Sequence, residues 1–239
     1  MIYADHKKWA DLVFKQYIYK LLKKSFYSIS VIGEVPEVPL DAPLILAPNH
    51  STWWDGFFVY LINRKYFDRK FFIMILEEQL EKYKFFTKLG GFSINKSSPK
   101  SIVKSLKYSA EILENYPHSV TTIFPQGELL PNFIKPLNFN RGIEKIVQYY
   151  GKKTYILPLS MRIEYLKEEK PSVFFKFGKL VEVIQNDDGL TNKLKHEVES
   201  GLETIGKKII AGEFGNIIMH GKISVSDKSK KAFNIIKKS

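Results

Sequence analysis

The sequence predicts an α/β fold, in which a single domain has a central, mostly parallel sheet flanked by helices. Strand-sized apolar runs alternate along the chain with longer amphipathic segments, which is the order that parallel strands with crossover helices produce. The chain has 239 residues, and 44% of them are hydrophobic. This length and this content suffice for one domain with a real core.

The first predicted element is a helix over residues 6–27, because apolar side chains recur there at spacings of three and four. The residues on this stripe are Ala10, Phe14, Tyr17, Ile18 and Leu21. The same segment is basic and contains Trp and Tyr, which is typical of helices that lie in a membrane interface. Packing against its own domain explains the stripe equally well, so both interpretations stay open.

The later elements are bounded by proline, glycine and changes of period. A connector with three prolines spans residues 34–43. The predicted strands are Leu44–Ala47, Phe71–Leu76, Val120–Phe124, Tyr155–Ile163 and Val173–Ile184, the last being one strand or a hairpin. The predicted helices are Thr52–Ile62, Glu77–Leu89 (stopped by Gly90 and Gly91), Ser101–Asn115, Arg141–Tyr150 and Leu190–Lys208.

These elements predict three parts: an N-terminal basic aromatic helix (1–33), the main α/β domain (34–210) and a basic C-terminal tail (211–239). Residues 222–239 carry six Lys and one Asp. Such a segment is either a solvated, disordered tail or a basic appendage that faces a membrane.

Composition narrows the possible functions. The chain has no cysteine, which excludes disulfides, thiolate metal sites and a cysteine nucleophile. Its net charge of +12 attracts nucleic acid, anionic lipid or acidic carriers, although dispersed lysines also keep an aromatic-rich protein in solution. No run approaches the ~20 apolar residues of a membrane span. We expect no signal peptide and no metal site.

His50 and Asp55 form the most informative pair. His50 directly follows a predicted buried strand, where open α/β sheets present functional groups. A histidine held by a carboxylate can act as general base for acyl transfer to a hydroxyl. The two side chains meet only if His50 precedes the next helix and Asp55 lies in its first turn. The structural alternative is a helix cap, since Thr52 and Asp55 have capping-box spacing.

Residues 49–55, NHSTWWD, resemble the NHxxxxD motif of the glycerolipid acyltransferases, the family of 1-acylglycerol-3-phosphate acyltransferases. Further blocks follow in the family's order. Residues 91–96, GFSINK, are similar to its second block, 124–128, FPQGE, to its third, FPEGTR, and 156–159, ILPL, to its fourth. Residues 139–142, FNRG, resemble its FKxG stretch. The resemblance covers about residues 40–185.

The resemblance implies the family's α/β fold, like that of glycerol-3-phosphate acyltransferase, with an N-terminal helical element at the membrane. It also implies His50 as the base, Asp55 as its partner and a membrane-borne acceptor. No cofactor is expected, with acyl-CoA or acyl carrier protein as co-substrate. The substrate-binding residues that it implies are Lys96, Gln126, Gly127, Glu128 and Arg141.

Three departures from the family's motifs bear on the acceptor. Lys96 replaces an Arg, Gln126 replaces a Glu, and Leu129 stands where the third block has its Arg. Lys lacks the planar fork that grips phosphate, and Leu carries no charge. Gln can donate and accept, which suits sugar hydroxyls. A purely structural interpretation of residues 124–128 is a strand-ending turn.

We therefore expect an O-acyltransferase that moves a fatty acyl group from a thioester to a membrane-borne hydroxyl, possible acceptors being a glycolipid or a glycosylated isoprenoid. The alternative is a 1-acylglycerol-3-phosphate acyltransferase of phospholipid synthesis. The non-enzyme alternative is a basic lipid- or nucleic-acid-binding protein, although no nucleic-acid motif is present. A hydrolase using Ser51 lacks the Gly-x-Ser-x-Gly elbow. We expect peripheral binding to an anionic membrane on the cytoplasmic face.

Overall fold

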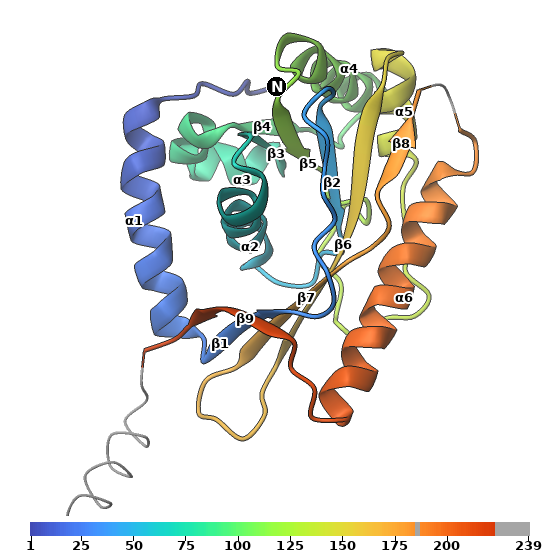
Figure 1. The fold of residues 1–239 in the computed structure, drawn as a ribbon. Helices are drawn as coiled ribbons and strands as arrows, with labels where there is room; N and C mark the ends of the chain where they lie inside the picture. Colours follow the sequence, from blue (N-terminus) through green and yellow to red (C-terminus); the bar gives the residue numbers. More distant parts are fainter. Residues whose placement is uncertain (185–186, 223–239) are drawn as a thin grey trace, which may run out of the picture.

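The computed structural model describes residues 1–184 and 187–222, and in these ranges nine strands form one sheet. Their order is β4-β3-β5-β2-β6-β7-β1-β9, and β8 pairs with β6 (Figure 1). The strands are β1 Ser28–Val31, β2 Leu44–Pro48, β3 Lys70–Leu76, β4 Gly91–Ile94, β5 Ser119–Thr122, β6 Thr154–Glu164, β7 Ser172–Phe177, β8 Val181–Val183 and β9 Asn216–His220. The predicted α/β class is confirmed, because five neighbouring strands of the sheet pair in parallel, namely β4, β3, β5, β2 and β6.

Helices cover both faces of the sheet. They are α1 Lys8–Ser25, α2 Asp55–Ile62, α3 Glu77–Lys82, α4 Pro99–Asn115, α5 Gly142–Tyr150 and α6 Leu190–Ile210. A π-helical turn, Asn63–Phe67, extends α2, and a 3-10 helix, Lys84–Leu89, follows α3. Figure 1 shows α1 and α2 on one side of the sheet and α4, α5 and α6 on the other.

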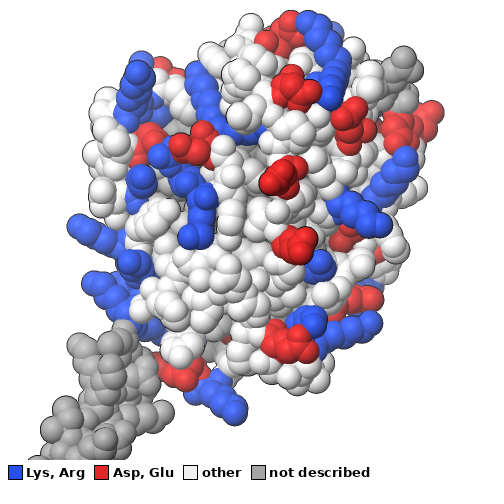
Figure 2. Space-filling view, in the orientation of Figure 1, with Lys and Arg blue, Asp and Glu red and all other residues white. Residues whose placement is uncertain are grey.

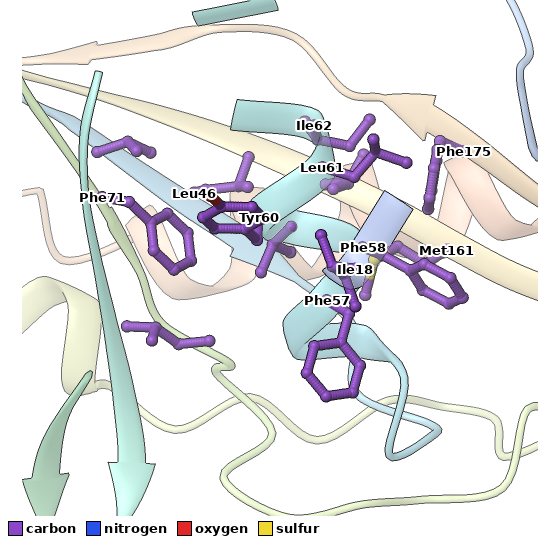
Figure 3. Packing of buried hydrophobic residues seen from close by; sticks show 14 of the residues in the cluster. Ile18, Leu46, Phe57, Phe58, Tyr60, Leu61, Ile62, Phe71, Met161 and Phe175 are labelled. Atoms are coloured by element: carbon purple, nitrogen blue, oxygen red, sulfur yellow. The ribbon is translucent and has the colours of Figure 1, made fainter. Parts of the chain in front are cut away.

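The central strand β2 connects the two cores. Its residues are all buried, as expected for a strand covered on both faces. Leu44 and Leu46 pack into the cluster shared with α1 and α2, whereas Ile45 and Ala47 pack into the cluster shared with α4, α5 and α6. Figure 3 shows part of the first cluster, in which Ile18 of α1 lies among aromatic residues of α2.

The segment 173–184 is neither an uninterrupted strand nor a hairpin. Strand β7 runs antiparallel to residues 159–164 of β6, and β8 runs antiparallel to residues 154–156 of the same strand. The two are one strand along β6 that is interrupted at residues 178–180. This antiparallel addition extends the sheet beyond its parallel half.

Two predicted helices differ in extent. Residues 77–89 divide at Tyr83 into α3 and the 3-10 helix, and Gly90 ends the segment with φ 97°. A Cβ at Gly90 would lie 2.0 Å from the carbonyl oxygen of Phe71, so only glycine fits there. Helix α2 begins at Asp55 rather than at Thr52, because residues 51–54 form a turn that directly follows His50, the candidate base.

The sheet extends beyond the predicted limits of the main domain, 34–210. Strand β1, assigned to the N-terminal part, pairs with β7, and β9, assigned to the tail, pairs with β1. Both strands are short, so their sequences contain too few residues for an alternation of apolar and polar side chains to indicate a strand. Residues 223–239, which make up most of the predicted basic tail, lie outside the described residues.

Helix α1 packs on the domain along one stripe. Its buried residues are Ala10, Phe14, Ile18 and Leu22. Tyr17 is exposed, together with Trp9, Leu12 and Val13 on the opposite side. Since burying one such side chain contributes about 1.5–3 kcal/mol, the stripe accounts for the docking of α1. The exposed apolar side remains available for another contact.

Candidate active site

The candidate site lies at the carboxyl end of β2, and Asn49 fixes the chain there. The Asn49 side chain donates to the carbonyl of Met161 at 3.0 Å and accepts from the Met161 N–H at 2.7 Å. Its own N–H donates to the Leu159 carbonyl at 3.2 Å. Asn49 is buried, and these three bonds continue the β2–β6 pairing by one residue past β2. These bonds therefore fix the backbone directly before His50.

His50 and Asp55 meet as the sequence predicts. The Nδ1 of His50 lies 2.9 Å from Oδ2 of Asp55, whose side chain is 1% exposed. A carboxylate in this position favours the tautomer with hydrogen on Nδ1, which leaves Nε2 with a free lone pair. His50 lines the large cavity described below, so a base is available to a bound molecule.

Asp55, the first residue of α2, also holds the turn that precedes the helix. Its Oδ2 accepts from the N–H groups of Ser51 at 2.7 Å and Thr52 at 2.9 Å, and its Oδ1 accepts from the Thr52 hydroxyl at 2.7 Å. The carboxylate thus reaches back to Thr52 as the acidic member of a capping box does, although the N-cap residue of α2, Trp54, makes no side-chain cap bond. The turn 51–54 is what brings the His50 ring back onto Asp55.

The imidazole ring is held from a second side by Phe124, which follows β5. The two rings are stacked, with centroids 4.1 Å apart and planes inclined by 21°. Stacking restricts rotation of the imidazole, while Asp55 sets its direction. The sequence motif contains Phe124, but spacing alone gave no sign of this contact.

Gln126 takes a different position from the one expected for a substrate-binding residue. Its Oε1 accepts from the His50 N–H at 2.7 Å, and its Nε2 donates to the His50 carbonyl at 3.4 Å. The side chain is buried and does not line the cavity. Gln126 thus clasps the His50 backbone, and its predicted contact with the substrate stays a prediction that this orientation does not support.

The turn around Gly127 connects Gln126 to the rest of the site. Gly127 has φ 74°, and a Cβ there would lie 3.1 Å from Asn140 Nδ2 and 3.2 Å from Lys96 Nζ. Lys96 donates a short bond to the Gly127 carbonyl. Asn140 donates to the carbonyls of Pro125 at 3.2 Å and Gln126 at 3.0 Å. Asn140 was missed, because an amide before a predicted helix carries no distinctive sequence signal.

A cavity of about 1,020 Å³ opens at His50 and extends between α1, α2 and β3. Apolar residues form most of its wall, among them Phe14, Phe57, Phe71, Ile73 and Phe86. Such a cavity is large enough for a ligand of many carbon atoms and excludes water from an acyl chain. No cavity of this kind could be located from the sequence.

Polar residues gather at one end of this cavity, which we call the polar end. They are Lys96, Glu128, Asn140, Arg141 and Lys145. Lys145 was not among the predicted residues, although it lies one helical turn beyond Arg141. Leu129 also lines the cavity, so the residue that replaces the motif Arg faces the site as an apolar group.

The charges of the polar end are mostly engaged within the protein. Arg141 pairs with Glu144 and lies 3.4 Å from Asp188, and the bond from Glu144 raises the pKa of Arg141. Lys145 bonds Gln148 at 3.0 Å. A ligand phosphate would have to compete with these partners.

Within residues 1–184 and 187–222, no helix is long and apolar enough to cross a membrane. In the same ranges, no three His, Asp or Glu side chains are grouped to hold a metal ion.

The site thus combines a histidine paired with a buried carboxylate and a mostly apolar cavity, on an α/β sheet that helices cover on both faces. The family model for Acyltransferase matches residues 28–162, and the chain belongs to this family. The match confirms the predicted family and the predicted enzyme class. Catalytic roles of individual residues remain predictions.

A comparison with solved structures supports the same fold. The chain is similar to the crystal structure of the 1-acyl-sn-glycerophosphate (LPA) acyltransferase, PlsC, from Thermotoga maritima, with a TM-score of 0.57 and 19% sequence identity. The similarity covers 83% of this chain and 79% of that chain. No curated protein matches the sequence.

Proposed function

We propose that this acyltransferase moves a fatty acyl group from an acyl thioester, carried by CoA or by acyl carrier protein, to a hydroxyl of a membrane-borne lipid. The observation that carries the proposal is the His50 ring, which has Nδ1 bound to Asp55 and opens onto an apolar cavity. The cavity suits an acyl chain, and the base suits a hydroxyl.

The proposed reaction proceeds by direct attack. Nε2 of His50 takes the proton of the acceptor hydroxyl as its oxygen attacks the thioester carbonyl carbon. Asp55 stabilises the resulting imidazolium. The tetrahedral intermediate then collapses, the carbon–sulfur bond breaks, and the imidazolium returns its proton to the leaving thiolate. An ester and a free thiol result, and no covalent acyl-enzyme is needed.

For the acceptor, we favour a hydroxyl of a glycolipid or of a glycosylated isoprenoid. Leu129 faces the cavity without charge, Glu128 beside it repels phosphate, and Arg141 is paired with carboxylates. Gln126, which is turned toward His50, no longer supports this choice.

The second candidate acceptor is 1-acylglycerol 3-phosphate. The presence of Lys96 and Lys145 together at the polar end favours it, because two ammonium groups could neutralise a phosphate monoester. The two acceptors differ in the group that the polar end would bind, a phosphate or a sugar. His50 and Asp55 would act in the same way on both.

Peripheral attachment to the cytoplasmic face of a membrane fits the outer side of α1. Trp9, Leu12, Val13 and Tyr17 are exposed there, and Phe85 lies beside Trp9 with ring centroids 6.2 Å apart. Residues 1–30 hold six Lys and two Asp, and Lys and Arg gather along the α1 side of the face in Figure 2. Anionic lipid attracts each such Lys by about 1 kcal/mol.

Vesicle flotation tests this attachment. We expect binding to anionic vesicles to exceed binding to neutral ones, and the double variant Leu12→Ser, Val13→Ser to bind both more weakly. Val103→Ser, at an exposed apolar residue of α4 on the other side of the sheet, is the control for the same kind of change away from α1. Equal flotation of the double variant and the unchanged protein would contradict a role for α1.

The reaction itself is tested by lipid mass spectrometry of cells with and without the gene, followed by assay of the purified protein. We expect one acylated species to disappear, and the protein to form it from acyl-CoA and the matching acceptor. Thioester hydrolysis with no acylated lipid would contradict the proposed transfer.

A further inference from the structure

A second hollow lies outside the large cavity, on the α6 side of the loop 128–138. It has a volume of about 350 Å³, and we call it the α6 pocket. Its lining residues are Lys135, Arg162, Leu202, Glu203, Gly206, Lys207 and Ile210. Three of these seven residues are cationic, which makes the pocket a candidate for an anionic ligand.

Arg162 is the least satisfied of the three cations. Its Nε is buried and makes no hydrogen bond, and the nearest carboxylate oxygen, from Glu164, is 3.8 Å away. Its Nη2 has a long bond, 3.4 Å, to the carbonyl of Asn132. Buried donors are normally hydrogen-bonded, so the unpaired Nε of Arg162 favours the binding of an acceptor at this position.

Two carboxylates, Glu203 and Glu164 (3.8 Å from Arg162), lie near the three cations and leave a net charge of +1. Lys135 is neutralised by Glu203 at 3.0 Å. Lys207 has no carboxylate within ion-pair distance among the residues that the structure describes. Gly206 keeps the guanidinium accessible, since even a Cβ there would lie 3.4 Å from Nη1 of Arg162. The end of α6 disfavours an anion, but bonds from Arg to phosphate are stronger than this dipole effect.

The α6 pocket lies close behind the catalytic histidine. Leu130, two residues before Asn132, donates its N–H to the His50 carbonyl at 3.0 Å. Met161, which precedes Arg162, holds the side chain of Asn49, which precedes His50. β2 and β6 are parallel neighbours, and His50 and Arg162 lie two and three residues beyond their last paired residues, Pro48 and Leu159.

We infer that the α6 pocket binds a phosphate ester through Arg162 and Lys207, and that this phosphate belongs to the pantetheine arm of the acyl donor. The assignment to the donor rests on the proposed function. The loop that carries Glu128 and Leu129, which line the large cavity, also carries Lys135, which lines the α6 pocket, so a donor arm that leaves the cavity along this loop reaches the pocket. An anionic lipid headgroup offers the same phosphate chemistry, so the test separates the two sources.

The first measurement is calorimetric binding of free CoA and of pantetheine, which lacks phosphate, to the full-length protein. Neither ligand requires an acceptor or turnover, so failure of the acyl-transfer proposal would not affect this result. We expect the double variant Arg162→Gln, Lys207→Gln to bind CoA about tenfold more weakly or worse, with pantetheine binding unchanged. Lys208→Gln, one residue further along α6 and outside the pocket, should behave as the unchanged protein.

The second measurement is flotation of the same variants with vesicles containing phosphatidylglycerol. Unchanged flotation, together with weakened CoA binding, supports the donor phosphate. Weakened flotation with unchanged CoA binding would overturn the assignment to the donor and would indicate that the pocket binds a lipid headgroup. If the double variant matched Lys208→Gln in both measurements, with native melting behaviour, the phosphate site itself would be excluded.

Discussion

Two regions of the molecule differ in how firmly the fold holds their side chains. One is the segment 49–55 around His50, and the other is the polar end of the large cavity. Asp55, Asn49 and Gln126 are each buried and together hold His50 by its ring, its preceding residue and its backbone. At the polar end, Glu128 and Leu129 are exposed, and the cations bind alternative partners. The proposed catalytic pair is therefore held firmly by the fold, whereas the proposed acceptor-binding end is formed by side chains that the fold constrains less.

The largest expected effect comes from His50→Ala. It removes the base, and we expect turnover to fall by about 10⁴-fold or more, because no second histidine lines the cavity among the described residues. The rest of the turn keeps its bonds to Asp55, so the circular dichroism spectrum and the melting temperature should change little. Near-normal turnover by a folded variant would remove His50 from the mechanism.

Asp55→Asn tests whether one carboxylate serves both catalysis and folding. We expect turnover to fall by about 10²–10⁴-fold, because the imidazole loses its carboxylate partner. We also expect a stability loss of about 1 kcal/mol, because the bonds from the Ser51 and Thr52 N–H groups to the carboxylate are weakened. Turnover and thermal unfolding are measured on the same preparation.

Thr52→Ala is the matched control for this variant. It removes the hydroxyl bond to Oδ1 of Asp55 but leaves Oδ2 facing His50. It should lose stability without a comparable loss of rate. If Thr52→Ala and Asp55→Asn lowered turnover equally, Asp55 would act only by holding the turn 51–54 and not as the partner of the imidazole.

The comparison also explains what could be predicted from the sequence. Local signals located His50, Asp55 and the helix that starts at Asp55, because the buried strand, the turn and the start of the helix are consecutive along the chain. The fold class followed from the alternation of periods. The orientation of Gln126 could not be predicted, since it depends on β5 and β2 lying side by side, 76 residues apart in sequence. The α6 pocket depends likewise on a loop, a strand and a helix that meet only in the fold.

A smaller effect is expected at the polar end from Leu129→Arg, which restores the residue of the family motif. An added guanidinium at the cavity should raise kcat/KM for 1-acylglycerol 3-phosphate relative to a glycolipid by about tenfold. Phe133→Arg adds the same charge on the same loop outside the cavity and serves as control. The two acceptors compete in one assay with a common acyl-CoA. A strong preference of the unchanged protein for 1-acylglycerol 3-phosphate would favour the phospholipid role.

The smallest expected effect concerns how Lys96 is supported. Glu77, at the start of α3, accepts from Ser93 at 2.6 Å and from Asn95 at 3.1 Å, and so ties down the segment that leads to Lys96. The bond from Ser93 contributes most to lowering the pKa of Glu77 from 4.5 to about 2. A depressed carboxyl pKa stabilises the folded state above the unfolded pKa, and this contribution is lost as the pH falls from about 4.5 toward 2.

We therefore expect Glu77→Gln to lower the free energy of unfolding at pH 7 by about 1–3 kcal/mol, with the difference from the unchanged protein shrinking below pH 4.5. Urea unfolding at several pH values measures it, and Glu81→Gln on the exposed side of α3 is the control. Turnover should fall by much less than in Asp55→Asn, because Glu77 acts on Lys96 only through the backbone. A pH-independent difference would mean that Glu77 contributes by packing rather than by its charge, and the segment before Lys96 would then be held less firmly than the hydrogen bonds indicate.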